Sequence, residues 1–93
     1  MVETIYTAVR YVAVYDDTDA YGVAAYRSRA EADNHVKRCT DWYHQAWGPQ
    51  GYDPSIIINT PSQDDPEAVT FLSRRGTELY WGVLEAPLIE LDK

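Results

Sequence analysis

Basic side chains and cysteine are scarce in this 93-residue chain. Eight lysines and arginines stand against 15 aspartates and glutamates, so the formal net charge is −7. A protein that binds nucleic acid needs a basic surface to displace phosphate counterions, so this charge argues against direct nucleic-acid binding. It argues equally against docking on an anionic membrane. The single cysteine, Cys39, cannot form an internal disulfide, which is typical of a reducing compartment.

Long apolar runs and clustered glycines are also missing. No run approaches the ~20 residues of a membrane span, and no apolar leader follows Met1, so we expect a cytoplasmic protein without a membrane partner. The five glycines are scattered, which excludes a glycine-rich phosphate loop. The length predicts a single domain over residues 1–93, with a small core that dimerisation would help to stabilise.

Patterns for metal binding and catalysis are sparse as well. His35 and Cys39 are four residues apart on a predicted helix, but two ligands do not make a zinc site. A calcium-loop frame that begins at Asp17 has Gly22 in the correct place, yet it has Ser28 where the closing glutamate belongs. No serine has the context of a nucleophile elbow. We therefore predict no metal, no cofactor and no enzymatic activity.

Residues 5–27 predict a β-hairpin. Residues 5–15 are rich in β-branched and aromatic types and apolar on both faces, which is typical of a central strand. The aspartate-rich residues 16–20 predict a turn, and residues 21–27 predict the returning strand. Gly22 inside that strand indicates a bulge or a close backbone approach.

Residues 28–47 predict the main helix. Ser28 and Glu31 form a capping box at its start, and Gly48-Pro49 ends it. One apolar stripe is expected to face the sheet, and Trp42 at its border is expected to be half exposed. The stripe consists of Ala32, Val36, Cys39, Tyr43, Ala46 and Trp47.

The last third of the chain predicts shorter elements. Residues 56–59 predict a short edge strand between two prolines. Residues 66–75 predict a short helix with Asp65 as N-cap, although residues 69–73 also fit a strand. Residues 78–86 predict the last strand, which Pro87 stops. The expected class is α+β, a mainly antiparallel three- to four-stranded sheet with one principal amphipathic helix on it, in the order ββαβ(α)β.

Parts of this pattern resemble a group of small domains. Gly22-Val23, Tyr26, Ser28 and Glu31-Ala32, followed late in the chain by residues 80–85, resemble small hairpin-helix-strand domains of unknown function found in bacteria and phages. The resemblance covers residues 21–45 and 79–91. It implies the fold and a phage setting, and it carries no catalytic or binding residue across.

Aromatic residues are the informative class, with eight tyrosines, three tryptophans and one phenylalanine. A core of this size cannot bury all of them, and exposed tyrosine and tryptophan dominate protein interfaces. The partner-binding candidates are Tyr6, Tyr15, Tyr21, Tyr26, Trp42, Tyr52, Tyr80 and Trp81.

These observations favour a non-catalytic, acidic protein-binding module, which the resemblance extends to a phage-encoded factor that binds a bacterial host protein. Self-association as a homodimer is a further expectation. One alternative is a nucleic-acid mimic with its carboxylates on one face. The candidates for that acidic surface are Asp16, Asp17, Asp19, Asp64, Asp65 and Glu67. A second alternative is a small-ligand-binding domain that holds an aromatic ring or a base in a groove lined by tyrosine and tryptophan.

Overall fold

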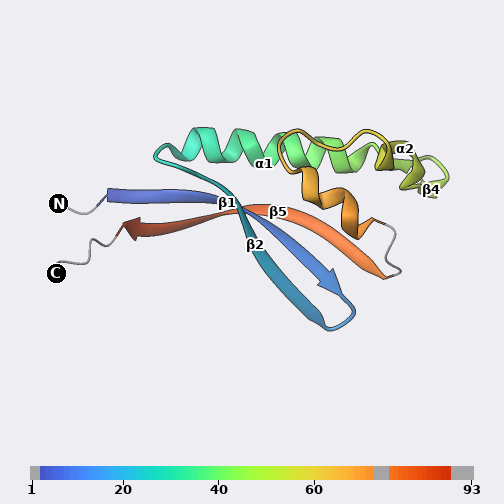
Figure 1. The fold of residues 1–93 in the computed structure, drawn as a ribbon, viewed down its shortest axis with the longest axis horizontal. Coiled ribbons are helices and arrows are strands. Elements are labelled where there is room, and N and C mark those ends of the chain that lie inside the picture. The colour runs from blue at the N-terminus through green and yellow to red at the C-terminus, as the bar shows by residue number, and fades with distance from the viewer. Residues whose placement is uncertain (1–2, 73–75, 89–93) are drawn as a thin grey trace.

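The computed structural model describes residues 3–72 and 76–88. It confirms the α+β class, with a three-stranded antiparallel sheet and one main helix (Figure 1). The elements, in chain order, are β1 (Glu3–Val14), β2 (Asp17–Tyr26), α1 (Arg29–His44), β3 (Trp47–Gly48), β4 (Gly51–Tyr52), α2 (Ser55–Ile58), the 3-10 helix η1 (Pro66–Phe71) and β5 (Thr77–Leu88). The strands β3 and β4 form a separate two-stranded hairpin.

Strand β1 is central, as its two apolar faces predict, because the order in the sheet is β2-β1-β5. The turn between β1 and β2 is shorter than expected. Val14 pairs with Asp17, so Tyr15 and Asp16 alone make the connection. A two-residue loop suits the twist of paired strands, and the backbone pairing extends through the aspartates that we assigned to a longer turn. Tyr15 adopts a left-handed φ of 55° at this tip.

The bulge expected near Gly22 is present. Ala8 pairs with Ala24 and Val9 pairs with Gly22, so Val23 is the extra residue on β2. A bulge increases the local twist of the bulged strand. The hairpin tip therefore turns away from α1, which the ribbon shows clearly (Figure 1).

Helix α1 begins as predicted, because the Ser28 Oγ accepts a hydrogen bond from the Glu31 backbone N–H at 3.4 Å. It ends at His44, however, and not near Trp47. Its buried face is also turned relative to the predicted stripe, because it includes His35 and Trp42. Trp47 belongs instead to β3, where it is 52 % exposed.

The short strand predicted over residues 56–59 is wrong, because Ser55–Ile58 form the helical turn α2. Asp53 favours this turn, since its carboxylate accepts hydrogen bonds from both the backbone N–H and the hydroxyl of Ser55. Only Ile57 of the isoleucine run is buried. The helical turn thus presents a single apolar side chain to the core, whereas a strand would need a partner edge.

The helix predicted from residue 66 is confirmed as the 3-10 helix η1, and its predicted end over residues 73–75 lies outside the described residues. The Asp65 side chain makes no capping hydrogen bond, which corrects the expected N-cap. Strand β5 passes the predicted stop at Pro87 and pairs it with Thr4. An edge strand tolerates proline, because one side of its backbone needs no partner.

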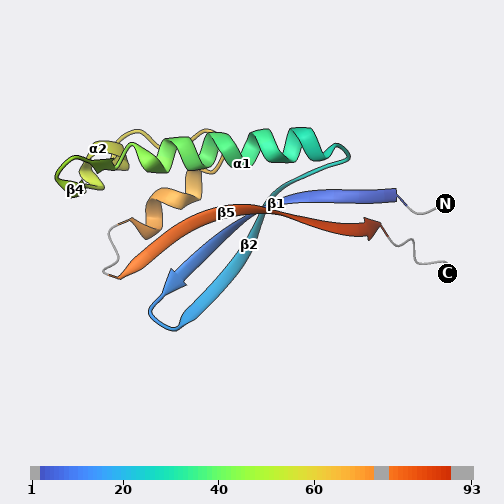
Figure 2. The same ribbon diagram turned by 180° about the vertical axis from the view of Figure 1, so that it is seen from behind.

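All helices lie on one side of the sheet, in both the front and the rear view (Figures 1 and 2). The core lies on that side and consists of Val12, Cys39, Trp42, Tyr43, Ala46, Ile57, Ala68, Leu72, Leu79 and Trp81. Among the described residues, no helix is long and apolar enough to span a bilayer. The other side of the sheet carries Ile5, Thr7, Val9, Tyr11 and the residues paired with them on β2 and β5, and we call it the open sheet face.

Candidate binding site

A hollow of about 400 Å³ is lined by residues from the β1–β2 tip, from the C-terminal end of α1 with the hairpin that follows it, and from the start of β5. We call it the aromatic hollow, because four rings line it together with the backbone turn into β5. Its lining residues are Tyr15, Tyr43, Trp47, Tyr52, Gly76, Thr77 and Glu78. They come from α1, β3, β4, β5 and the two turns that hold Tyr15 and Gly76, so the hollow exists only in the folded chain.

The small β3–β4 hairpin positions two of the rings. Trp47 and Tyr52 pair across it, with their ring centroids 5.0 Å apart. The Asp53 N–H donates to the Ala46 carbonyl at 2.6 Å and closes the loop at its base. Gly51 permits the tight connection with a φ of 105°. This pairing takes the chain out of the helical path and leaves Trp47 at the surface.

Tyr43 and Tyr15 are the other two rings that line the aromatic hollow. Tyr43 is 7 % exposed, and its ring lies 6.0 Å from that of Tyr52, so it forms the floor. Tyr15 is 82 % exposed, although its ring lies against Gly76. A Cβ at Gly76 would lie 3.1 Å from the Tyr15 ring, so this glycine permits the close approach. A tyrosine with a left-handed φ costs conformational energy, and such costs often mark functional surfaces.

The Tyr52 phenol is neutral at physiological pH. Burial, with the Tyr43 hydroxyl beside it, raises the pKa of Tyr52 to about 12. Among the described residues, the charged side chain that lines the hollow is that of Glu78. Asp16 and Asp17 follow Tyr15 in the hairpin, and Glu78 is at the rim. None of these three forms an ion pair within residues 3–72 and 76–88, whereas every lysine and arginine in that part of the chain does. Within the described part of the chain, the hollow is therefore lined by aromatic rings, with the Glu78 carboxylate at its rim.

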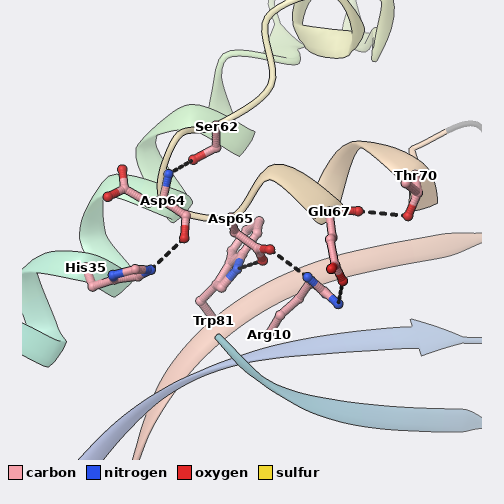
Figure 3. Close-up of polar contacts among 8 residues, drawn as sticks. All are labelled: Arg10, His35, Ser62, Asp64, Asp65, Glu67, Thr70 and Trp81. Carbon is pink, nitrogen blue, oxygen red and sulfur yellow. Dashed lines mark hydrogen bonds and ion pairs between the residues drawn. The ribbon is translucent and has the colours of Figure 1, made fainter. Parts of the chain in front are cut away.

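A second, polar cluster lies on the same side of the sheet (Figure 3). Arg10 of β1 is 4 % exposed and donates from Nη1 to the Asp65 carboxylate at 2.6 Å. The other oxygen of Asp65 accepts from the Trp81 indole at 2.9 Å. The guanidinium also lies 5.1 Å and 5.0 Å from the ring centroids of Tyr21 and Phe71. This arrangement holds the start of η1 on the sheet.

The space beside Arg10 is a polar pocket of about 460 Å³. Its rim carries Asp64 and Glu67, and Glu67 lies 3.9 Å from the guanidinium. The Arg10 Nε has no hydrogen-bond partner in the described part of the chain. The positive charge of Arg10 is already balanced by Asp65, so the pocket presents neither a free cation for an anionic ligand nor a nucleophile.

His35 forms the third polar contact of this face (Figure 3). Its Nε2 lies 2.8 Å from the Asp64 carbonyl, and its Nδ1 lies 2.8 Å from the Tyr26 hydroxyl. A carbonyl can only accept, so Nε2 donates to Asp64, and Nδ1 shares a hydrogen bond with the Tyr26 hydroxyl. Both ring nitrogens are thus used for structure. His35 is 6 % exposed and belongs to the buried face of α1.

Cys39 is fully buried in the core, and burial, followed by the carboxylates of Asp65 and Asp64, raises the pKa of its thiol to about 12. The thiolate is the reactive form, so at pH 8 only about one molecule in 10,000 would carry it. We expect iodoacetamide to leave the native protein unmodified at pH 8 and to alkylate it fully in urea. Mass spectrometry measures this, and rapid alkylation of the native protein would contradict the described burial.

The expected partner-binding aromatics divide into three groups. Tyr15, Tyr21 and Tyr80 are exposed, whereas Tyr6, Tyr26 and Tyr52 are partly buried. Trp42 and Trp81 are buried, which corrects their assignment to the surface. Each of these indoles donates inside the protein, Trp42 to the Thr60 carbonyl at 2.7 Å and Trp81 to Asp65. The hollow unites Tyr15 and Tyr52 with Tyr43 and Trp47, which the sequence reasoning missed.

The expected acidic surface also divides. Asp16, Asp17 and Asp19 are exposed together at the β1–β2 hairpin. Asp65 is buried and is not part of any surface, because it neutralises Arg10. Asp64 pairs with Arg38 at 2.9 Å, and Glu67 is 82 % exposed. The six carboxylates therefore form no single acidic face. Near η1, Arg10 pairs with Asp65 and Arg38 pairs with Asp64, and these two arginines interrupt the negative charge.

Residues 3–72 and 76–88 contain no group of three or more histidine, cysteine or acidic side chains arranged to hold a metal ion. Comparison with known protein families, with curated proteins and with solved structures gives no match to this chain.

Proposed function

We propose that this protein is a non-catalytic, acidic protein-binding module that holds a basic side chain of its partner in the aromatic hollow. The observation that carries the proposal is the exposure of Trp47 and Tyr15, at 52 % and 82 %, on the walls of a preformed hollow. Exposed tyrosine and tryptophan around a concave site are the usual anchors of protein recognition.

The chemistry of the hollow favours a lysine or arginine side chain as its occupant. Aromatic ring faces attract cations, and a site of several rings strengthens this attraction when water is excluded. The neighbouring carboxylates Asp16, Asp17 and Glu78 carry the opposite charge to such a partner. The net charge of −7 would also steer a basic protein surface toward this module.

The proposal extends to biological context along the resemblance of residues 21–45 and 79–91. We propose that the module is phage-encoded, acts in the bacterial cytoplasm and binds a host protein through a basic segment. Self-association as a homodimer is part of the same proposal, because a core of this size leaves apolar surface to cover.

The test uses a short glycine-serine peptide with one central arginine, and the same peptide with citrulline in its place. Citrulline keeps the shape of arginine and removes the charge. We expect the arginine peptide to bind about tenfold more tightly than the citrulline peptide, as titration calorimetry can measure. The preference should persist from about pH 6 to 9, because the raised pKa of Tyr52 keeps its ring neutral.

Two variants assign the binding to the hollow. Trp47→Ala should weaken binding of the arginine peptide about tenfold, because it removes one ring from the wall. Tyr80→Ala is the matched control, because Tyr80 is 49 % exposed but lies on the open sheet face. Equal affinities of the arginine and citrulline peptides, or equal losses in both variants, would contradict the proposal.

The two alternative functions have less support. A nucleic-acid mimic needs a continuous acidic face, and Asp64 and Asp65 are paired with arginines. A small-ligand domain remains compatible with the hollow, but the Glu78 carboxylate at its rim favours a cation over a neutral or anionic ring. A thermal-shift screen with nucleotides separates this alternative, because stabilisation by a nucleotide would favour it.

A further inference from the structure

We infer that the open sheet face is the surface on which two copies of this chain form a symmetric dimer. This inference rests on the self-association in the proposed function, and it does not depend on the aromatic hollow. The face is formed by Ile5, Thr7 and Tyr11, by Val9, which is only 3 % exposed, and by their paired neighbours on β2 and β5, and none of these residues is charged. No helix covers it in either view (Figures 1 and 2).

The first argument is the amount of exposed surface. The chain has a mass of 10.6 kDa and exposes 6641 Å². A compact monomer of this mass exposes about 5,500 Å², so the 93 residues together, those outside the described ranges included, expose roughly 1,100 Å² more. A stable interface buries about 800 Å² on each partner. The radius of gyration of 15.2 Å likewise exceeds the roughly 12 Å expected for a compact chain of this length.

The second argument is the shape of the open sheet face. The β5 side carries large side chains, with Leu84 51 % exposed and Tyr80 49 % exposed. Tyr80 stacks on Tyr11 with ring centroids 4.9 Å apart, so the ridge is fixed in place. The β2 side carries only small residues at the corresponding positions, namely Ala20, Gly22 and Ala25. One half of the face is therefore raised, and the other half is smooth.

These two halves complement each other under two-fold symmetry. A two-fold axis parallel to β1, between two stacked sheets, places the β5 side of each copy over the β2 side of the other. Leu84 then faces Ala25, and Tyr80 faces Ala20, twice in the dimer. A surface that fits itself in this way is what a two-fold interface requires, and aligned stacking of twisted sheets is a common packing mode.

A second copy fits these positions better than a basic partner does, because none of them is a carboxylate, and Glu78 follows only beyond Tyr80, at the end of the face. The like charges of the two copies lie outside it. Raising the NaCl concentration from about 50 to 500 mM should therefore strengthen the dimer, since it screens their repulsion. Dissociation at high salt would instead indicate an interface held by opposite charges and would contradict the inference.

The closing experiment is sedimentation velocity of the full chain over a concentration series. We expect a dimer, and we expect Leu84→Arg to weaken association about 100-fold or more, because it buries an unpaired charge. Ile56→Arg is the matched control, because Ile56 is 52 % exposed on α2, away from the sheet. This variant should stay dimeric. A monomeric wild type, or a Leu84→Arg variant as dimeric as the control, would overturn the inference.

Ala25→Arg provides a second variant that removes no packed side chain, and it should also yield a folded monomer. Circular dichroism checks that each variant is folded. Trp47→Ala should remain dimeric, and Leu84→Arg should still bind the arginine peptide. Loss of one activity without the other distinguishes failure of this inference from failure of the binding site in the hollow.

Discussion

Replacing Asp65 by alanine is expected to lower the free energy of unfolding by about 3–5 kcal/mol, a large part of the stability of a domain. Asp65 is 3 % exposed, and its two oxygens bind the Arg10 guanidinium and the Trp81 indole. Without the carboxylate, the guanidinium stays buried between two rings with its charge uncompensated. Urea unfolding followed by circular dichroism measures the loss.

Glu67 provides the control for this prediction. Its carboxylate lies 3.9 Å from the same guanidinium, but its side chain is 82 % exposed. Solvent screens such a pair, so Glu67→Ala should change the stability by less than about 0.5 kcal/mol. The double variant Arg10→Met, Asp65→Ala should recover part of the loss, because it also removes the buried charge. Equal losses for Asp65→Ala and Glu67→Ala would show that the buried ion pair is not important for stability.

The second large effect is expected at Ile57, which α2 inserts fully into the core. Replacing Ile57 by alanine should cost about 2–5 kcal/mol, because the lost methyl groups leave a cavity in the core. This single turn is otherwise held mainly by the Asp53 and Pro54 contacts at its start. The same urea titration measures the effect.

Ile56 is the neighbouring control, of the same residue type and in the same helical turn. It is 52 % exposed, so Ile56→Ala should change the stability by less than about 0.5 kcal/mol. The pair also tests the correction made to the predicted strand. Had residues 56–59 formed a strand, Ile56 and Ile58 would share one face opposite Ile57. A larger loss for Ile56→Ala than for Ile57→Ala would therefore contradict the described helical turn.

The features predicted well from the sequence depend on nearby residues. The Ser28 cap needs only Glu31, three residues away, and the central place of β1 follows from its own two apolar faces. The bulge beside Gly22 is another local signal. In each case the residues that set the geometry lie within one element, so pattern and structure agree.

The features predicted poorly depend on distant partners. The helical pattern continues through Trp47, but pairing with Tyr52 removes that residue from α1. A hairpin signal was present in the sequence, since residues 47–52 read Trp-Gly-Pro-Gln-Gly-Tyr, with aromatics flanking a turn. The burial of Trp81 had no local signal, because its indole is satisfied by Asp65 from another part of the chain.

The sequence predicted that aromatic residues would form the candidate site, but it did not predict which of them come together. An excess of aromatics for a small core indicated an exposed patch, and Tyr15 and Tyr52 were among the candidates. Which rings meet depends on the β1–β2 tip, α1 and the β3–β4 hairpin coming together, and no periodicity within one element contains that information. Asp65 shows the same limit, because a residue typical of a helix cap instead balances a buried arginine.

The measurement that tests the binding site most directly is a ¹H–¹⁵N NMR titration that follows the three tryptophan indole signals with the arginine peptide. Trp42 and Trp81 serve as internal references, because their indole N–H groups donate to Thr60 and Asp65 inside the protein. Trp47 is the exposed tryptophan of the hollow. We predict that the Trp47 signal shifts and saturates while the other two stay in place. A static Trp47 signal at saturating peptide, or shifts confined to Trp42 and Trp81, would contradict the assignment of the hollow as the binding site.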